Sequence, residues 1–306
     1  MATTFTSPFK AENVSLNLPH GCLIKLQSVY PLLKRAERTA ADFLLTHGDA
    51  LVSNTIAEIA DYSECSQATW VRLSKRLGYT GFAELRAELE QHINENISVV
   101  VPPRESALYH NIDAQSSPKQ IAAIVFESTI NALKDTLEMI DEDQYNQAIT
   151  ALLGAKMILL AGVGDAGAVA RSAYQKLFRA GFNVYSSEDH DLQLIGSGRL
   201  CSGDVLIAIS YSGRTKSVLD VVKHAKKRGA VVIAITNYPG TPLCKNADIT
   251  LLTAAFAKSI NGEIVSKRAT QLCVIESLYV NLMLRLGNEL DMSLRRSNTA
   301  ISLNKF

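Results

Sequence analysis

The sequence predicts two domains of different class, an all-α domain followed by an α/β domain with a parallel sheet flanked by helices. Two observations carry this prediction. Between Leu23 and about Ile97, apolar residues recur at three- and four-residue spacing, which is typical of helices. From about Lys156 onward, short apolar runs alternate with helical patterns, which is typical of strands and helices in a parallel sheet. The length of 306 residues suits two domains of ordinary size.

Composition and charge limit the classes of protein to which the chain can belong. Apolar residues make up 47% of the chain and the net charge is +1, so bulk electrostatics favour neither a membrane surface nor nucleic acid. The five cysteines lie at no metal-ligand spacing, and we expect reduced thiols with no metal and no cofactor. The first 20 residues do not resemble a signal peptide, and no apolar run reaches the roughly 18 residues of a membrane span. We therefore expect a cytoplasmic protein with no membrane partner.

Prolines and serines between the two patterns predict a linker, from which the domain boundaries follow. The expected organisation is a tail over residues 1–21, a helical domain over 22–97, a linker over 98–118, an α/β domain over 119–290 and a polar tail over 291–306. The α/β domain is expected to open with one long helical pattern from Lys119 to about Leu153. We expect the linker and this helical pattern to couple ligand binding in one domain to the other domain.

The stretch "TIAEIADYSECSQATWVRLSKRLGY" has the layout of a helix-turn-helix. Ser66 is placed to cap the second helix. Along that helix, one face carries the apolar residues and Ser74 at helical spacing, namely Trp70, Leu73, Ser74 and Leu77. The other side carries amide and basic groups that can reach base edges and phosphates. The candidate DNA-contacting residues are Ser66, Gln67, Thr69, Arg72, Lys75 and Arg76.

The charge of this half leaves a second interpretation open. Residues 1–100 contain nine Lys and Arg against eleven Asp and Glu, a net charge of −2, so only the cluster of Arg72, Lys75 and Arg76 indicates DNA. The alternative is an ordinary helical domain with one basic surface helix.

Two glycine-containing turns follow predicted strands in the second half. In "LLAGVGDAG", Gly162, Gly164 and Gly167 have the G-x-G-x-x-G spacing of dinucleotide-binding folds, and Glu188 or Asp189 lies where such folds hold a ribose hydroxyl. A lone match of this kind is weak evidence, because glycines also allow a strand and a helix to pack closely.

The second turn, "SYSGRT", is better suited to a phosphate monoester. Ser210, Ser212 and Thr215 can direct three hydroxyls at one anion, while Gly213 lets the backbone approach it. The amides that begin the following helix add donors and a favourable dipole. The alternative is a helix start with incidental serines.

These motifs together resemble the bacterial RpiR/MurR-type transcriptional regulators, in which a helix-turn-helix precedes a sugar isomerase (SIS) domain. The resemblance rests on "SQATWVRLSKRLGYTGF", on the SIS signature S-x-S-G-x-T at Ser210 to Thr215, and on "TPLCKNAD" before the last strand. It implies a five-stranded parallel sheet and a phosphosugar effector. It also implies a homo-oligomer, dimer or tetramer, that presents paired recognition helices to a two-fold operator. The candidate phosphosugar-binding residues are Gly164, Ser210, Ser212, Gly213, Thr215 and Glu263.

The chain departs from the family pattern at two positions. Ala166 stands where many SIS domains have a ligand-binding serine, so one hydroxyl contact is missing. Trp70 stands where the family usually has a small aliphatic residue, which implies either a different helix spacing or a partly buried indole.

An enzyme has to be weighed against a sensor, because SIS domains also occur in aldose–ketose isomerases. Isomerisation needs a base beside the carbonyl, and Glu263 and His190 are the available candidates; His190 is equally well explained as a solvated loop residue. Binding without turnover is the simpler interpretation, and we expect no catalytic residue. The favoured function is a DNA-binding regulator of carbohydrate metabolism genes that senses a phosphorylated sugar or amino sugar. The alternatives are a sugar-phosphate isomerase with a helical assembly domain and, third, a dinucleotide-sensing regulator.

Overall fold

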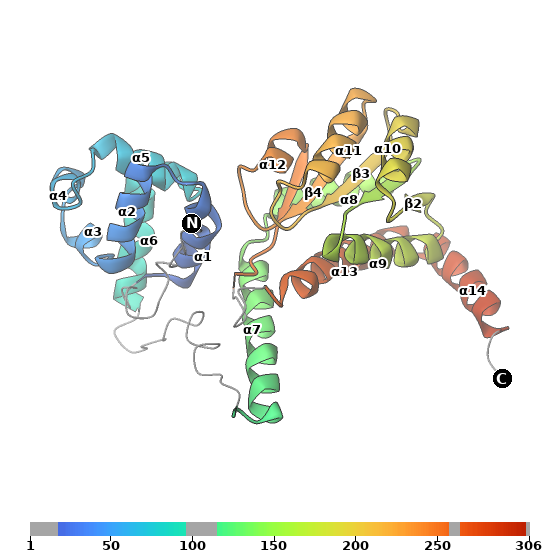
Figure 1. The fold of residues 1–306 in the computed structure, drawn as a ribbon, viewed down its shortest axis with the longest axis horizontal. Coiled ribbons are helices and arrows are strands. Elements are labelled where there is room, and N and C mark those ends of the chain that lie inside the picture. Colours follow the sequence, from blue (N-terminus) through green and yellow to red (C-terminus); the bar gives the residue numbers. More distant parts are fainter. Residues whose placement is uncertain (1–17, 96–114, 257–263, 304–306) are drawn as a thin grey trace. The chain divides into compact units, whose positions relative to one another are not determined.

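A computed structural model describes residues 18–95, 115–256 and 264–303, and the chain forms two compact units (Figure 1). The first unit comprises residues 1–138 and 256–265, and the second comprises 139–255 and 266–306. Within the described residues, no helix is long and apolar enough to cross a membrane.

In the described residues, the first unit is built of helices, as the sequence predicts for residues 22–97. Its helices are α1 (His20–Val29), the 3-10 turn η2 (Tyr30–Leu32), α2 (Arg35–Thr46), α3 (Ala50–Ser53), α4 (Ile56–Tyr62), α5 (Gln67–Arg76), α6 (Phe82–Glu95) and α7 (Pro118–Glu138). The amphipathic faces of α1 to α6 share one core, in which Leu26, Leu44, Leu51, Leu85 and Leu89 are fully buried. Burial of these faces, more than helix propensity, stabilises helices this short.

Trp70 lies at the centre of this core with no exposed surface. Its indole meets the rings of Phe43 and Phe82 edge-on, with ring centroids 6.1 and 5.9 Å apart. Its Nε1–H donates a hydrogen bond of 2.9 Å to Oγ of Ser63, in the turn between α4 and α5. The indole is therefore completely buried, and a polar partner satisfies its only donor.

The second unit is built on a five-stranded parallel sheet in the order β2-β1-β3-β4-β5. The strands are β1 (Ile158–Ala161), β2 (Val184–Ser186), β3 (Val205–Ile209), β4 (Val231–Thr236) and β5 (Ile249–Leu252). The helices are α8 (Glu142–Gly154), α9 (Asp165–Arg179), α10 (His190–Arg199), α11 (Lys216–Lys227), α12 (Pro242–Asn246), α13 (Lys267–Leu286) and α14 (Asn288–Ser302). The fold class therefore agrees with the sequence-based prediction.

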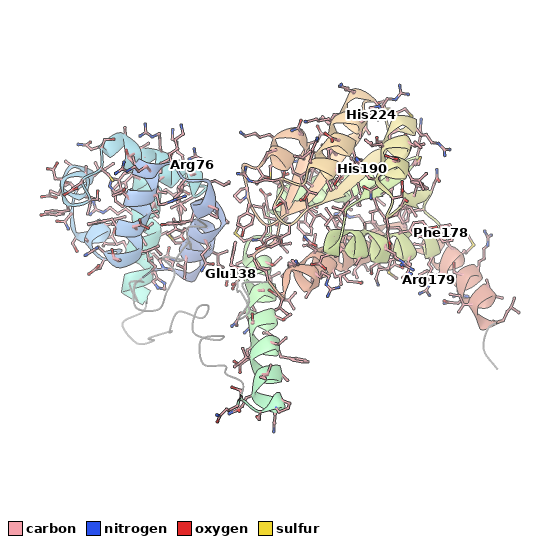
Figure 2. The ribbon with its side chains drawn as sticks, in the orientation of Figure 1. Arg76, Glu138, Phe178, Arg179, His190 and His224 are labelled. Carbon is pink, nitrogen blue, oxygen red and sulfur yellow. The ribbon has the colours of Figure 1, made fainter. Side chains whose placement is uncertain are left out.

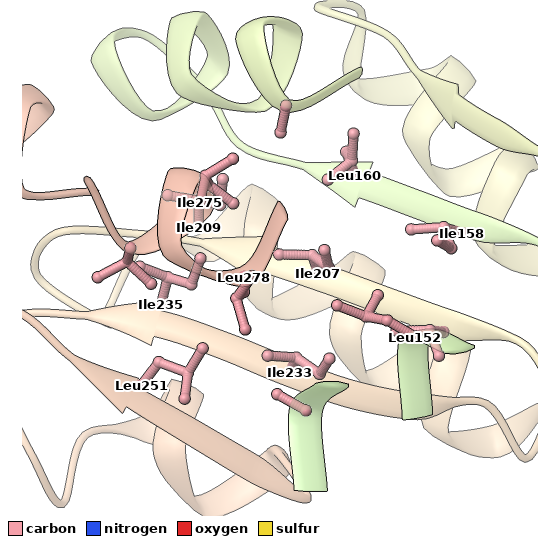
Figure 3. Close-up of a cluster of buried hydrophobic side chains, with 14 of the residues drawn as sticks. Leu152, Ile158, Leu160, Ile207, Ile209, Ile233, Ile235, Leu251, Ile275 and Leu278 are labelled. Carbon is pink, nitrogen blue, oxygen red and sulfur yellow. The ribbon is translucent and has the colours of Figure 1, made fainter. Parts of the chain in front are cut away.

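Helices cover both faces of the sheet, because successive strand residues point to opposite faces. On one face, Ile207 of β3 and Ile233 of β4 pack against Ile275 and Leu278 of α13, together with α8 and α9 (Figure 3). On the other face, a second cluster joins the alternate strand residues to α11, which contributes Val221. Burial on both faces explains why these strands are continuous apolar runs.

Three features differ from the sequence-based expectation. The helical pattern from Lys119 forms two helices, because the side chain of Asp141 caps α8 by accepting a 3.0 Å hydrogen bond from Gln144 N–H. The first of these helices, α7, groups with the helical unit instead of the sheet unit. Residues 190–199 form α10, whose sequence shows no clear helical pattern.

The expected C-terminal tail is mostly helical, because α14 continues to Ser302. Arg179 at the end of α9 holds α14 in place (Figure 2). Its guanidinium donates to Asn298 Oδ1 at 2.9 Å, and its carbonyl accepts from Ser297 Oγ at 2.9 Å.

Replacing Trp70 with alanine removes the largest buried side chain of the helical unit. We expect Trp70→Ala to lower the free energy of unfolding of that unit by about 3–5 kcal/mol, because the core cannot close the cavity. The exposed Tyr62 is the control, since Tyr62→Ala should change stability by no more than about 0.5 kcal/mol. Urea unfolding followed by circular dichroism measures both variants, and equal stability of the two would contradict the packing described above.

Candidate functional site

The first candidate site is the helix-turn-helix formed by α4 and α5. Thr55 and Glu58 cap α4 reciprocally, with Thr55 N–H donating to the Glu58 carboxylate at 2.7 Å. The turn passes through Glu64, which has a left-handed φ of 53°. Ser66 Oγ then accepts a 3.2 Å hydrogen bond from Thr69 N–H, which confirms the predicted cap of α5.

The two sides of α5 divide as the sequence predicts. Trp70, Leu73, Ser74 and Leu77 are buried. Gln67, Arg72 and Lys75 are exposed, as is the capping residue Ser66. An amide and two cations therefore project from the solvent side of the helix, and these are the groups that read base edges and phosphates in this motif.

Thr69 is buried, although the sequence analysis groups it with the exposed candidates. Its hydroxyl lies 2.8 Å from Ser66 Oγ and accepts a 3.1 Å hydrogen bond from Arg72 Nη2. The buried Thr69 hydroxyl therefore holds both the Arg72 guanidinium and the capping Ser66 side chain in position. A small polar residue at this spacing suits either side of a helix, which is why the sequence alone does not place it.

Arg76 is partly committed to an ion pair within the unit (Figure 2). Its Nε donates a 3.0 Å hydrogen bond to Oε1 of Glu37 on α2, while Glu37 Oε2 accepts from Lys34 N–H at 3.0 Å. Burial of the Glu37 carboxylate opposes ionisation, but the Lys34 amide and the Arg76 guanidinium outweigh it and lower the pKa of Glu37. Glu37 thus fixes α5 against α2, a role that the sequence analysis missed.

The second candidate site lies at the carboxyl end of the parallel sheet. β1 pairs with β2 on one side and with β3 on the other. The chain therefore leaves β1 toward β2 first and then crosses to β3 on the opposite side, so the direction of the connections reverses between β1 and β3. In open α/β sheets such a switch point opens the crevice in which ligands bind. The turns that follow β1 and β3 are the two glycine-containing turns of the sequence analysis.

The turn after β3 brings together the predicted hydroxyl groups. Ser210 Oγ and Thr215 Oγ1 are 3.0 Å apart, and Ser212 Oγ accepts from Arg214 N–H at 3.3 Å. No side-chain cap closes the start of α11, so the Thr215 hydroxyl is not used for capping. Arg214 and Lys216 are exposed beside these hydroxyls, and the sequence analysis did not single them out. Hydroxyls, helix-start amides and cations together suit a compact anion.

Gly213 is required by a close approach of the backbone. A Cβ atom at this position would lie 2.2 Å from Thr241 Oγ1 and 3.0 Å from Thr236 Oγ1. Its φ of 61° also favours glycine. The Gly213 carbonyl accepts a 3.1 Å hydrogen bond from Leu243 N–H, which ties the turn to α12.

The turn after β1 uses its glycines in two different ways. A Cβ at Gly162 would lie 2.6 Å from the Ala166 carbonyl oxygen, so this glycine allows strand and helix to approach each other. Gly164 has a φ of 59° and open space around it. The sheet order also differs from the 3-2-1-4-5-6 order of dinucleotide-binding folds. Close packing therefore accounts for Gly162, and the positive φ accounts for Gly164.

The start of α13 is held against this turn by charge. Lys267 Nζ lies 2.5 Å from Asp165 Oδ2, and Arg268 Nε lies 3.7 Å from Asp165 Oδ1. The hydrogen bond from Lys267 lowers the pKa of Asp165, with the charges of both basic residues adding to the effect. Asp165 follows Gly164 directly, so this contact fixes the first residues of α9.

Three further residues bear on this site. Gln193 is buried, and its Nε2 donates to the carbonyls of Gly162 at 2.9 Å and Ser187 at 2.7 Å, which joins two turns at the crevice. Gln193 could not be found from sequence, because α10 was not predicted. His190 begins α10 and is half-buried, so it is not a solvated loop residue (Figure 2). Glu263 lies outside the described residues.

A helix-turn-helix unit joined to an α/β unit with a hydroxyl-rich turn defines a class of transcriptional regulator, and comparison with known proteins agrees. A model of the helix-turn-helix domain of the rpiR family matches residues 20–96, and an SIS domain model matches residues 151–281. The HTH-type transcriptional regulator HexR of Escherichia coli K12 is 30% identical over 93% of this chain and 95% of HexR. RpiR of the same strain is 27% identical over 80% of each chain. The chain belongs to the rpiR family of helix-turn-helix transcriptional regulators.

Among solved structures, Vibrio vulnificus NanR, complexed with ManNAc-6P, shares the fold. Its TM-score is 0.57 at 23% identity, over 93% of this chain and 99% of that structure.

Alanine substitutions at two glycines separate backbone strain from steric clash. Gly164 and Gly213 share a left-handed φ near 60°, but only Gly213 faces Thr241. We expect Gly164→Ala to cost about 1–3 kcal/mol of stability from strain alone, because φ 59° with ψ −127° lies outside the regions that residues with a Cβ adopt. Gly213→Ala should cost a further 1–3 kcal/mol or so, because Thr241 is buried and cannot yield freely. Urea unfolding of the sheet unit measures the difference, and equal losses would show that the turn does not approach Thr241 this closely.

Proposed function

We propose that this chain regulates carbohydrate metabolism genes by binding a two-fold operator with an affinity that a phosphorylated sugar or amino sugar modulates. The observation that carries the proposal is the hydroxyl-rich turn at the sheet's switch point, on the same chain as an exposed recognition helix. One element suits a phosphate monoester and the other suits the major groove.

The DNA-binding half of the proposal rests on the solvent side of α5. Gln67, Arg72 and Lys75 are exposed on one helix, and Thr69 holds the guanidinium of Arg72 in place. Arg76 retains 41% of its side-chain surface while it is paired with Glu37, so it contributes to the same basic surface. We propose that DNA is contacted directly by Gln67, Arg72, Lys75 and Arg76. Ser66 would contribute at the start of the helix, and Thr69 would act by holding the Arg72 guanidinium in position.

The effector-binding half rests on the turn after β3. A phosphate group would accept hydrogen bonds from Ser210, Ser212 and Thr215 and from the first amides of α11, with the Arg214 and Lys216 cations beside it. Gly164 leaves open space on the neighbouring turn for the sugar. Because Ala166 carries no hydroxyl, recognition depends more heavily on the turn after β3.

The isomerase alternative has one observation in its favour. His190 Nδ1 is buried without a hydrogen-bond partner in the part of the chain that the structure describes. Proton transfer beside a carbonyl requires a base, and an imidazole nitrogen without a hydrogen-bond partner could supply it. Turnover of a sugar phosphate by the purified chain, lost in His190→Ala, would favour this alternative.

Arg72→Ala tests the DNA-binding half. Selection of genomic fragments by the purified protein at moderate salt identifies the operator, and fluorescence anisotropy then measures its affinity. We expect the variant to lose about 1–3 kcal/mol of operator binding, or roughly 5- to 150-fold, with unchanged effector binding. The exposed Arg199 on α10 supplies the control, because Arg199→Ala should bind the operator normally. Joint loss of operator and effector binding in Arg72→Ala would contradict the division into two sites.

Ser212→Ala tests the effector-binding half. A hydrogen bond to a charged group contributes about 1.5–3 kcal/mol, so the effector concentration for half response should rise at least roughly ten-fold. Operator affinity without effector should stay unchanged. Ser202→Ala, in the exposed turn before β3, is the matched control at the amino end of the same strand. A normal response in Ser212→Ala would remove the phosphate assignment.

A further inference from the structure

Helix α7 has its large apolar side chains on the exposed side. Phe126, Ile130 and Leu137 are 70%, 48% and 69% exposed. The opposite side of the same helix buries Ser128, Ala132, Asp135 and Thr136, which are small or polar. A helix that only covered its own unit would have the reverse arrangement. The exposed apolar side therefore indicates a partner surface.

The spacing of these residues is that of a coiled coil. Ala123, Phe126, Ile130, Leu133 and Leu137 follow one another at intervals of three, four, three and four residues. At 100° per residue they occupy a sector of roughly 80° on the helix. This set, which we call the α7 seam, has the a and d positions of two heptads: Ala123, Ile130 and Leu137 at a, and Phe126 and Leu133 at d.

The charges that flank the seam differ between its two sides. Glu127 and Lys134, both exposed, occupy the two e positions. The g positions on the other side are Ala122 and Thr129, which carry no charge, and Thr136, which is buried within its own unit. In a parallel pair of identical helices e faces g, so neither charge would meet an opposite charge. In an antiparallel pair e faces e, and the two charges can meet.

One antiparallel register satisfies both the apolar and the charged positions. If Ile130 packs against Leu133 of a second copy, Phe126 packs against Leu137 of that copy. The same register places Glu127 opposite Lys134 of the second copy, and by symmetry this ion pair forms twice. The two-fold axis then passes midway between the levels of Asn131 and Ala132.

We propose that the α7 seam binds the α7 seam of a second copy of this chain as an antiparallel, two-fold coiled coil. The interface is isologous, so each copy contributes the same residues. It relates the two helix-turn-helix segments by the same two-fold axis, which is the symmetry that a palindromic operator requires. The proposal goes beyond the function proposed above and holds whether or not a sugar phosphate is the effector.

Charge reversal with rescue tests the ion pairs in the full-length chain. Glu127→Lys and Lys134→Glu each place like charges together twice, so sedimentation equilibrium should show roughly a ten-fold rise in the dissociation constant for self-association. The double variant restores opposite charges and should return to within about three-fold of the original. Glu138→Lys is the control, because the register places Val125 and its uncharged neighbours opposite it. Single reversals without effect, or a double variant that is not rescued, overturn the proposal.

Cysteine cross-linking tests the register independently. In a background with the exposed Cys201 and Cys273 changed to serine, a double variant with Glu127→Cys and Lys134→Cys should give a covalent dimer on oxidation, because each cysteine faces the other one on the second copy. Glu127→Cys alone is the control, because the register sets the two Glu127 positions more than two helical turns apart along the axis, so this variant should not cross-link to itself. No covalent dimer from the double variant, or an equal yield from Glu127→Cys alone, overturns the antiparallel register.

Discussion

The close approach of the Gly213 backbone to Thr241 is the constraint on which the proposed effector site depends. Only a residue without Cβ fits there, and the Leu243 amide holds the turn in that position. The fold of this turn brings Ser210 and Thr215 within hydrogen-bond distance across five residues of chain. Because the turn leaves β3 beside β1, these hydroxyls lie at the switch point of the sheet and not at its edge.

The helix-turn-helix depends on a comparable constraint inside its own unit. Trp70 fills the core and donates to Ser63, which fixes the turn between α4 and α5. The Glu37–Arg76 ion pair and the Thr69–Arg72 hydrogen bond then orient basic side chains that would otherwise be free to rotate. Buried groups thus set the geometry of exposed ones, and orienting side chains before binding reduces the entropy lost on binding DNA.

The two-domain organisation, the sheet and the capped α5 could be predicted from sequence because each rests on local periodicity or local hydrogen bonds. Other features depend on tertiary contacts. Helix α10 contains Gly196, which lies close to Leu159 and Tyr185. Because contacts with the sheet stabilise this helix, its own sequence shows no helical periodicity from which it could be predicted. The Glu37–Arg76 pair joins residues 39 positions apart, and the burial of Thr69 is not visible in the local pattern of α5. Of the predicted effector-site residues, Ser210, Ser212, Gly213 and Thr215 share one turn, while Glu263 stays a prediction.

Thermodynamic linkage tests most directly whether one chain couples an anion site to a DNA site. Calorimetric titration of the effective sugar phosphate into the protein, with and without saturating operator, gives two effector affinities. Anisotropy gives operator affinity with and without saturating effector. The account predicts that both ratios differ from one and are equal, because coupling between binding sites is reciprocal. Effector affinity that is the same with and without operator would contradict the account.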